Sequence, residues 1–148
     1  MTSTITETMG KITTTLAITN HADQIRLEDG VIQIDRVRSI TIKNVLVDTG
    51  ATTLCLPQDA IAQLGLKLLK TVPVATATGI GTARIFEDAK ISLMGRDATF
   101  ECIELPAGAD PLLGVIPLEA LGIELDLQKQ TLVLLPLSPT ASYLRIRI

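Results

Sequence analysis

Aromatic residues are nearly absent from this sequence, and its basic residues do not cluster. Phe86, Phe100 and Tyr143 are the only aromatic side chains among 148 residues, tryptophan is missing, and the formal net charge is -3. Proteins that bind single-stranded nucleic acid stack its bases on aromatic side chains, and they neutralise phosphates with clustered Lys and Arg. We therefore expect no nucleic-acid partner.

Histidine and cysteine are scarce as well. His21 is the only histidine, and Cys55 and Cys102 are the only cysteines. Zinc sites and Ser-His or Cys-His catalytic pairs need these residues in clusters, so we expect no metal and no cofactor. Each cysteine lies in an apolar stretch, where a free thiol behaves as a small hydrophobic group, although spacing alone leaves a disulfide open. If the protein is an enzyme, carboxylates must carry its chemistry.

Long apolar runs are also missing. None approaches the roughly 20 residues that span a bilayer, and the first residues lack the basic and then apolar pattern of a secretory signal. These absences favour a soluble, cytoplasmic protein. The length suits one domain, and a hydrophobic content of 47% is enough for a core. Because short alternating runs of Ile, Val, Leu and Thr favour strands, we predict an all-β fold.

Alternation of apolar and polar residues predicts strands over 11–19, 38–47, 54–56, 90–94, 98–105, 123–127 and 131–135. The dipeptide Asp29-Gly30 suits a tight turn, so a hairpin is expected between Ile25–Leu27 and Val31–Ile34. A solvent-exposed turn is expected just before it, at His21–Gln24.

Two short helices are expected, over Gln58–Leu64 and Pro117–Leu121. Gly65 and Gly122 lie just past their ends, where glycine commonly terminates a helix. In both places the helix follows an apolar strand that ends in glycine, and an extended segment comes after it. This echo suggests two related half-units within one domain.

The stretch Val45–Val47 reads as the end of a buried strand and runs directly into Asp48-Thr49-Gly50. An ionised carboxylate is costly to bury without partners. Asp48 is therefore either solvated at a turn or held in a functional site. The tripeptide alone leaves both interpretations open, because Asp and Gly are also common in ordinary turns.

Two glycines, Gly79 and Gly81, bracket the single apolar residue Ile80. Such a segment does not suit a strand interior, so we predict the mobile tip of a long hairpin that starts at Leu66–Ala77 and returns through Phe86. A plain hairpin turn is the simpler alternative. An apolar side chain at an exposed tip, however, usually has something to cover.

A third element, Leu112-Leu113-Gly114, precedes the second short helix. With the Asp-Thr-Gly motif and the glycine-rich hairpin, in this order, it resembles the retropepsin-like aspartic proteases, the single-domain class of retroviral proteases and bacterial relatives. The resemblance covers about residues 11–135. It implies an all-β, closed-barrel-like retropepsin fold with one or two short helices and a flap hairpin.

The resemblance also suggests how the chain is divided. A protease domain is expected over residues 9–136, after a flexible N-terminal segment at 1–8. A tail follows at 137–148, in which Leu144–Ile148 alternates like a terminal strand. This tail is expected to take part in the dimer interface or to form an edge strand.

The family's chemistry implies a homodimer, because this chain carries one Asp-Thr-Gly motif and the reaction needs two carboxylates. Two carboxylates about 3 Å apart share one proton and activate a water that hydrolyses a peptide bond. The resemblance assigns catalysis to Asp48, Thr49 and Gly50, with Thr49 holding its symmetry mate. No cofactor is implied.

The same resemblance implies that an extended peptide with apolar flanking residues lies under the flap. The residues expected to line its site are Ala51, Gly79, Ile80, Gly81, Leu112 and Leu113. Ala51 stands where pepsin-like motifs often have Ser or Thr, so we expect activity at milder pH than that of pepsin.

The sequence departs from the retroviral pattern at two positions. Thr52 and Val115 replace an Asp and an Arg that commonly pair in retroviral enzymes. The dimer is therefore expected to be held differently, by the strand at 123–127 or by Leu144–Ile148.

Two other functions fit the motif. A catalytically silent dimer could keep the fold to bind peptides or partner proteins, because fold does not dictate function. An aspartyl-phosphate enzyme would also place Asp48 at a strand end. That chemistry needs magnesium-binding carboxylates and a Lys near the motif, and neither is evident.

Overall fold

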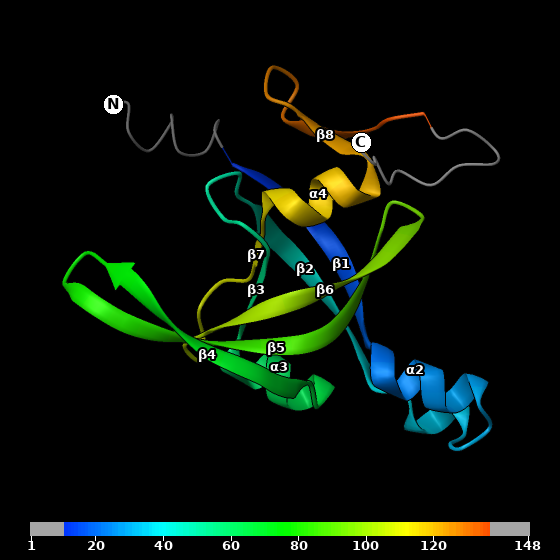
Figure 1. Cartoon of the computed structure of the whole chain (residues 1–148). Coiled ribbons are helices and arrows are strands. Elements are labelled where there is room, and N and C mark those ends of the chain that lie inside the picture. Colours follow the sequence, from blue (N-terminus) through cyan, green and yellow to red (C-terminus); the bar gives the residue numbers. More distant parts are fainter. Residues whose placement is uncertain (1–10, 137–148) are drawn as a thin grey trace, which may run out of the picture.

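The computed structural model describes residues 11–136, and the expectations for residues 1–8 and 137–148 lie outside this range. Seven strands form one sheet in the order β1-β2-β7-β3-β6-β5-β4. An additional pairing of β1 with β5 closes six of these strands into a ring, and β4 remains outside it (Figure 1). The prediction of an all-β, closed-barrel-like fold is confirmed.

The elements in chain order are β1 (Ile12–Asn20), α2 (His21–Glu28), the 3-10 helix η1 (Ile34–Arg36), β2 (Ser39–Val47), β3 (Leu54–Pro57), α3 (Gln58–Leu64), β4 (Lys67–Thr76), β5 (Gly79–Leu93), β6 (Arg96–Leu105), β7 (Leu112–Leu113), α4 (Val115–Leu121), β8 (Ile123–Asp126) and β9 (Thr131–Leu134). Strands β8 and β9 form a separate two-stranded sheet. The strands predicted from alternation and both predicted helices are present, and α4 begins two residues earlier than expected. Within residues 11–136, no helix is long and apolar enough to cross a membrane.

The core is aliphatic, as the near absence of aromatic residues requires. Along β1, Ile12, Leu16 and Ile18 are buried, while the threonines between them point outward or lie half-buried. Phe86 is the one fully buried aromatic side chain of the described chain, at 6% exposure. Burial of each such aliphatic side chain contributes about 1.5–3 kcal/mol, which gives the ring of strands its stability.

A bulge bends β2 just before its end. The pairing with β1 changes register, because Ile42 lies opposite Leu16 whereas Val45 lies opposite Thr14. One extra residue on β2 is therefore accommodated, and Asn44 there adopts a φ of 61°. Bulges of this kind turn the strand that follows. The bend aims the last residues of β2 at β7.

The prediction of a hairpin between residues 25 and 34 is wrong, because residues 25–28 form the second half of helix α2. The Asn20 side chain caps that helix by accepting a hydrogen bond from the Asp23 backbone N–H at 3.0 Å. Gly30, with a φ of 75°, follows the helix end instead of forming a hairpin turn. His21 is the half-buried first helical residue and does not lie in a solvated turn.

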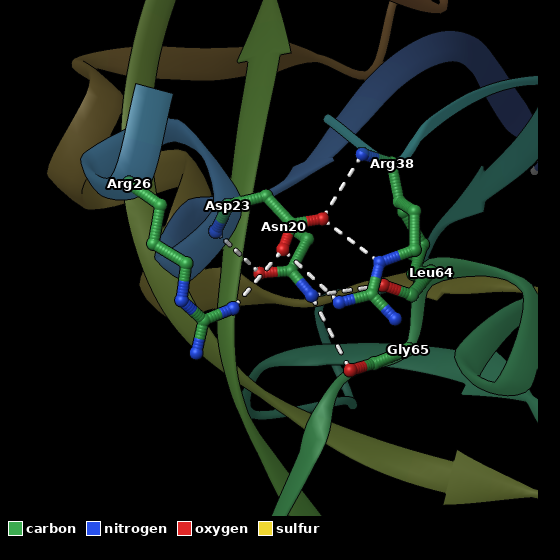
Figure 2. A network of polar contacts seen from close by, with 6 residues as sticks. All are labelled: Asn20, Asp23, Arg26, Arg38, Leu64 and Gly65. Carbon is green, nitrogen blue, oxygen red and sulfur yellow. Dashed lines mark hydrogen bonds and ion pairs between the residues drawn. The ribbon is translucent and has the colours of Figure 1, made fainter. Parts of the chain in front are cut away.

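A partly buried polar network holds α2 against the rest of the fold (Figure 2). The Asp23 carboxylate, 2% exposed, accepts hydrogen bonds from Arg38 Nε at 2.8 Å, Arg38 Nη2 at 3.0 Å and the Arg38 backbone N–H at 3.0 Å. Asn20 Nδ2 donates to the carbonyls of Leu64 and Gly65 at the end of α3. These partners lie far away in sequence, so the helix depends on tertiary contacts that outweigh the local Asp-Gly signal.

Candidate active site

Asp48 follows directly on β2 and is held there by β7. Leu46 and Val47 pair in parallel with Leu112 and Leu113. The Asp48 backbone N–H then donates to the Leu113 carbonyl at 3.0 Å. The structure thus brings together two motifs that are more than 60 residues apart in the sequence. Leu112 is half-buried, whereas Leu113 is fully buried beneath the Asp48 turn.

The turn after Asp48 orients the carboxylate. Asp48 Oδ1 accepts a hydrogen bond from the Gly50 backbone N–H at 2.8 Å, and the Ala51 N–H donates to the Asp48 carbonyl at 3.0 Å. A Cβ on residue 50 would lie 3.1 Å from Asp48 Oδ1, which is tighter than an ordinary contact. Asp48 is half-buried, while Thr49 and Gly50 are exposed. The carboxylate is therefore fixed on one oxygen and presented at the surface.

The first residues of α4 support this turn from the other side. Three backbone N–H groups donate to three carbonyls of the turn: Gly114 to Thr53 at 3.0 Å, Val115 to Ala51 at 3.0 Å, and Ile116 to Thr52 at 2.9 Å. These N–H groups have no partner inside the helix, so the turn satisfies them and the helix in turn fixes the loop.

Gly114 makes this close approach possible. A Cβ on Gly114 would lie 2.6 Å from the Ala51 carbonyl oxygen and from the Thr53 backbone N and O atoms. The sequence identified Gly114 only as the end of an apolar motif. Its position immediately before a helix was the available signal, but the loop that it contacts could not be deduced locally.

The hairpin predicted to be a flap, and called the flap below, consists of β4 and β5 and projects from the body of the molecule (Figure 1, green, at left). Its turn lies at Ala77–Thr78, because Thr76 pairs with Gly79 and Thr76 Oγ1 donates to the Gly79 carbonyl at 2.8 Å. The prediction that Gly79-Ile80-Gly81 forms the tip is therefore wrong by two residues.

The three residues begin β5 instead. Gly79 has a φ of 135°, which lets the chain leave the tight turn, and Ile80 lies opposite Ala75. The Ile80 side chain is 85% exposed, the highest value among the large exposed hydrophobic residues. No hydrogen bond joins Gly79, Ile80 or Gly81 to the Asp48 turn within residues 11–136.

Both cysteines are buried free thiols. Burial raises the pKa of Cys102 and of Cys55, and the nearby charge of Asp48 raises the pKa of Cys55 further. A thiol is reactive only as thiolate, so neither cysteine is suited to act as a nucleophile. Among the described residues, no group of three or more His, Cys, Asp or Glu side chains could hold a metal ion.

Two cavities of the single chain lie away from Asp48. A cavity of about 850 Å³ lies among α2, η1 and Arg38, and one of about 450 Å³ lies between β2 and α3. Neither is lined by Asp48, Ala51 or Leu112. The half-buried Asp48 therefore lies outside both of these cavities.

A family model described as "gag-polyprotein putative aspartyl protease" matches residues 41–120, more than half of the chain. The matched segment contains the Asp48 turn, the flap and β7. A search of curated proteins finds no match.

Solved structures of viral proteases are similar to this chain. The EIAV protease in complex with the inhibitor HBY-793 is 19% identical, with a TM-score of 0.50, over 78% of this chain and 92% of that chain. The solution structure of the Simian Foamy Virus (mac) protease is 20% identical, with a TM-score of 0.43, over 53% of this chain and 80% of that chain. At this identity the likeness to the EIAV protease shows the fold.

Proposed function

Since the chain belongs to the family of gag-polyprotein putative aspartyl proteases, we propose that it is an aspartic endopeptidase whose active form is a homodimer. The observation that carries this proposal is the placement of Asp48. Its carboxylate stands at a strand end, oriented by the Gly50 N–H and open to the surface. The motif Asp-Thr-Gly occurs once in the sequence, so one chain supplies one such carboxylate.

The chemistry requires a second carboxylate. Two carboxyl groups about 3 Å apart cannot both ionise, so the pair holds one proton and can act as base and acid together. A single Asp48 carboxylate can act as the base, but no second carboxyl group is then present to act as the acid. A twofold axis next to Asp48 supplies the missing group from a second copy of the same chain.

In this dimer the carboxylate pair holds a water molecule. The ionised carboxylate takes a proton from the water as the water oxygen bonds to the scissile carbonyl carbon. At the same time the protonated carboxyl gives its proton to the carbonyl oxygen. As the tetrahedral intermediate collapses, the C–N bond breaks, the nitrogen receives the proton of the protonated carboxyl, and one hydroxyl of the intermediate returns its proton to the ionised carboxylate. The products are a carboxylic acid and an amine.

The residues beside Asp48 take supporting roles. Thr49 is exposed, so its hydroxyl is available to bond to Thr49 of the second copy across the axis. Gly50 has no side chain and lets the substrate backbone approach. Ala51 offers no hydroxyl to the carboxylate, so we expect a milder pH optimum than that of pepsin.

The flap indicates the substrate class. No charged side chain occurs between residues 71 and 83, and the exposed Ile80 is free to be covered by a ligand. Together with Gly79, Gly81 and the half-buried Leu112, it offers uncharged, apolar contacts. We propose an extended peptide with apolar residues around the cleaved bond, held by backbone hydrogen bonds like an added strand. Leu113 is fully buried and supports this site from beneath.

The hairpin of β8 and β9 is a candidate for the dimer contact. Leu127, Val133 and Leu134 on it are 73%, 42% and 39% exposed, and Ile116 on α4 is 47% exposed. Apolar groups on a two-stranded sheet gain stability when a second copy covers them. This contact would replace the ion pair that Thr52 and Val115 cannot make.

Mixing experiments test the proposal directly. Wild type should cleave an unstructured protein at apolar sites, pepstatin should inhibit it, and Asp48→Ala should be inactive while keeping its dimeric mass. An equal amount of the Asp48→Ala chain, equilibrated with wild type, should reduce activity to roughly half, because half of the wild-type chains then sit in mixed dimers.

Two outcomes contradict the proposal. If activity per chain stays constant upon dilution into the monomer range, the shared dyad is excluded. If wild type and Asp48→Ala give identical products, the chain is better described as a peptide-binding dimer without catalysis.

A further inference from the structure

The flap leaves the body of the molecule at a sharply defined point on β5. From Gly79 to Arg84, β5 pairs only with β4, whereas from Ile85 onward it also pairs with β6, starting with Ile85 opposite Ile103. The hairpin beyond this point is a two-stranded ribbon attached at one end. The angle between this ribbon and the body of the molecule therefore depends on the backbone and contacts at residues 84 and 85.

Arg84 lies at this point and makes two contacts with the body. Its Nη1 is 3.5 Å from Glu104 Oε1, and its Cζ lies 5.1 Å from the centroid of the Phe86 ring. The Glu104 side chain is 16% exposed and Phe86 is 6% exposed, so both partners are anchored. Glu104 is also held in register, because it lies opposite Leu56 in the parallel pair of β3 and β6.

Charge makes Arg84 distinctive. It is the only charged residue between Thr71 and Phe86. Arg84 is therefore the only side chain in this part of the flap that can form an ion pair with the body. Alternation along β5 places residues 80, 82, 84 and 86 on one face. Arg84 therefore shares a face with Ile80 toward the tip and with Phe86 toward the core.

We propose that Arg84, Glu104 and Phe86 form a hinge that sets the angle of the flap, and that Arg84 is a positioning residue for substrate binding. The inference rests on the proposed protease function for its kinetic part only. With the contacts in place, the ribbon is held near one angle. Without them it samples a wider range, and part of the binding free energy of the substrate is spent on bringing it back.

The expected size of the effect is modest, because Arg84 is 47% exposed and solvent screens its ion pair. An ion pair and a cation–π contact of this kind together shift an equilibrium by about five-fold. Arg84→Gln removes both contacts and should raise KM by about that factor, whereas Glu104→Gln removes the ion pair alone and should raise KM by less. The value of kcat should change less than two-fold, because Asp48 and its turn are untouched.

Hydrogen exchange measured by mass spectrometry on the full chain tests the hinge without any substrate. Exchange in residues 71–83 should rise about five-fold in Arg84→Gln, and the double variant with Glu104→Gln should show little further increase. Arg84→Lys keeps the charge and should restore part of the protection. The matched control is Asp97→Asn. This change removes a 3.9 Å ion pair with Lys90, which joins β5 to β6 as the Arg84–Glu104 pair does but lies away from the flap.

The hinge is overturned if flap exchange in Arg84→Gln equals that of wild type, or if Asp97→Asn raises it equally. Equal losses of kcat and kcat/KM would show a general structural role and would also overturn it. If the chain has no protease activity, the proposed function fails while the exchange comparison still decides whether the hinge exists.

Discussion

The α-carbon of Gly114 lies so close to the Ala51 carbonyl oxygen that an added Cβ would stand 2.6 Å from it. The backbone of Gly114, with φ at -90°, is open to any residue, so glycine is demanded by this contact and by the equally close Thr53 backbone N and O atoms. Gly114→Ala must push α4 away from the turn that carries Asp48. We expect a loss of about 1–3 kcal/mol in urea unfolding and of most proteolytic activity.

Gly81→Ala serves as the control for this substitution. A Cβ there would lie 3.5 Å from Thr76 Cγ2, which is an ordinary contact. Its unfolding midpoint should stay close to that of wild type. Similar losses of stability in the two variants would contradict the proposed clash at Gly114.

Acid should weaken the Asp23–Arg38 pair. Hydrogen bonds from the Arg38 side chain hold the pKa of Asp23 below its ordinary value. A lowered folded-state pKa contributes stability that is present above the unfolded value, about 3.9, and is lost as pH falls through the folded value. Asp23→Asn should cost about 2–3 kcal/mol at pH 7, with Arg38 able to reach water, and the deficit should shrink below about pH 4.

Urea unfolding at pH 7 and at pH 3 measures both quantities. Asp35→Asn, at an exposed position, should leave the midpoint unchanged at either pH. A deficit of Asp23→Asn that stays constant between these pH values would show that the ion pair does not titrate as described.

Gly65 should be far less replaceable than Gly30, although both have positive φ values, 63° and 75°. A Cβ on Gly65 would overlap Arg38 Nη1, whereas nothing lies within 4 Å of the same position at Gly30. Gly30→Ala should cost about 1–2 kcal/mol from backbone strain alone. Gly65→Ala should cost more, because Arg38 must also leave Asp23.

Thermal unfolding of these two alanine variants is the measurement. The excess cost at Gly65 should nearly disappear when Arg38 is also replaced by alanine. If the excess persists in that background, the guanidinium is not its cause.

Cys55 and Cys102 should resist alkylation in the folded protein. They are 6% and 0% exposed, and burial raises the pKa of both thiols, so little thiolate is available at pH 8. Iodoacetamide followed by mass spectrometry should show two modified cysteines in urea and almost none without it. Rapid double labelling of the native chain would contradict the buried placement, and absence of labelling in urea without reductant would indicate a disulfide.

Arg96 should hold the β8–β9 hairpin to the body. Its Nη1 donates to the Leu121 and Gly122 carbonyls at 2.9 Å, and its Nη2 donates to the Leu135 carbonyl. Arg96→Met leaves these carbonyls without their cationic donor, which should cost about 2–3 kcal/mol. Faster hydrogen exchange over residues 123–134 would locate the loss, and weaker dimerisation should accompany it if this hairpin forms the contact. Exchange that stays unchanged there would contradict this role.

Local sequence signals predicted much of the fold. The alternation in β1 and the glycines after α3 and α4 act within a few residues, and Gly65 and Gly122 do adopt the expected left-handed conformation. The position of Asp48 at the end of an apolar strand followed from the same kind of pattern. Such interactions are readable because both partners lie in one short window of the sequence.

The predictions were wrong where contacts between residues distant in sequence determine the local structure. Asp29-Gly30 favours a hairpin locally, but Asn20 bonds to the Leu64 carbonyl 44 residues away, and Asp23 pairs with Arg38. At the flap, the register of β4 with β5 moved the turn to Ala77–Thr78.

The sequence by itself determined most of the strands, the ends of α3 and α4, and the position of one carboxylate directly after a buried strand. Only the tertiary structure decided what holds the turn that carries this carboxylate. The turn is held by the Leu113 carbonyl, by the backbone N–H groups at the start of α4, and by the close contact of Gly114 with Ala51 and Thr53. The physical reason is that hydrophobic periodicity and glycine conformation are local, whereas hydrogen bonds across the closed ring of strands join residues whose separation in sequence carries no local signal.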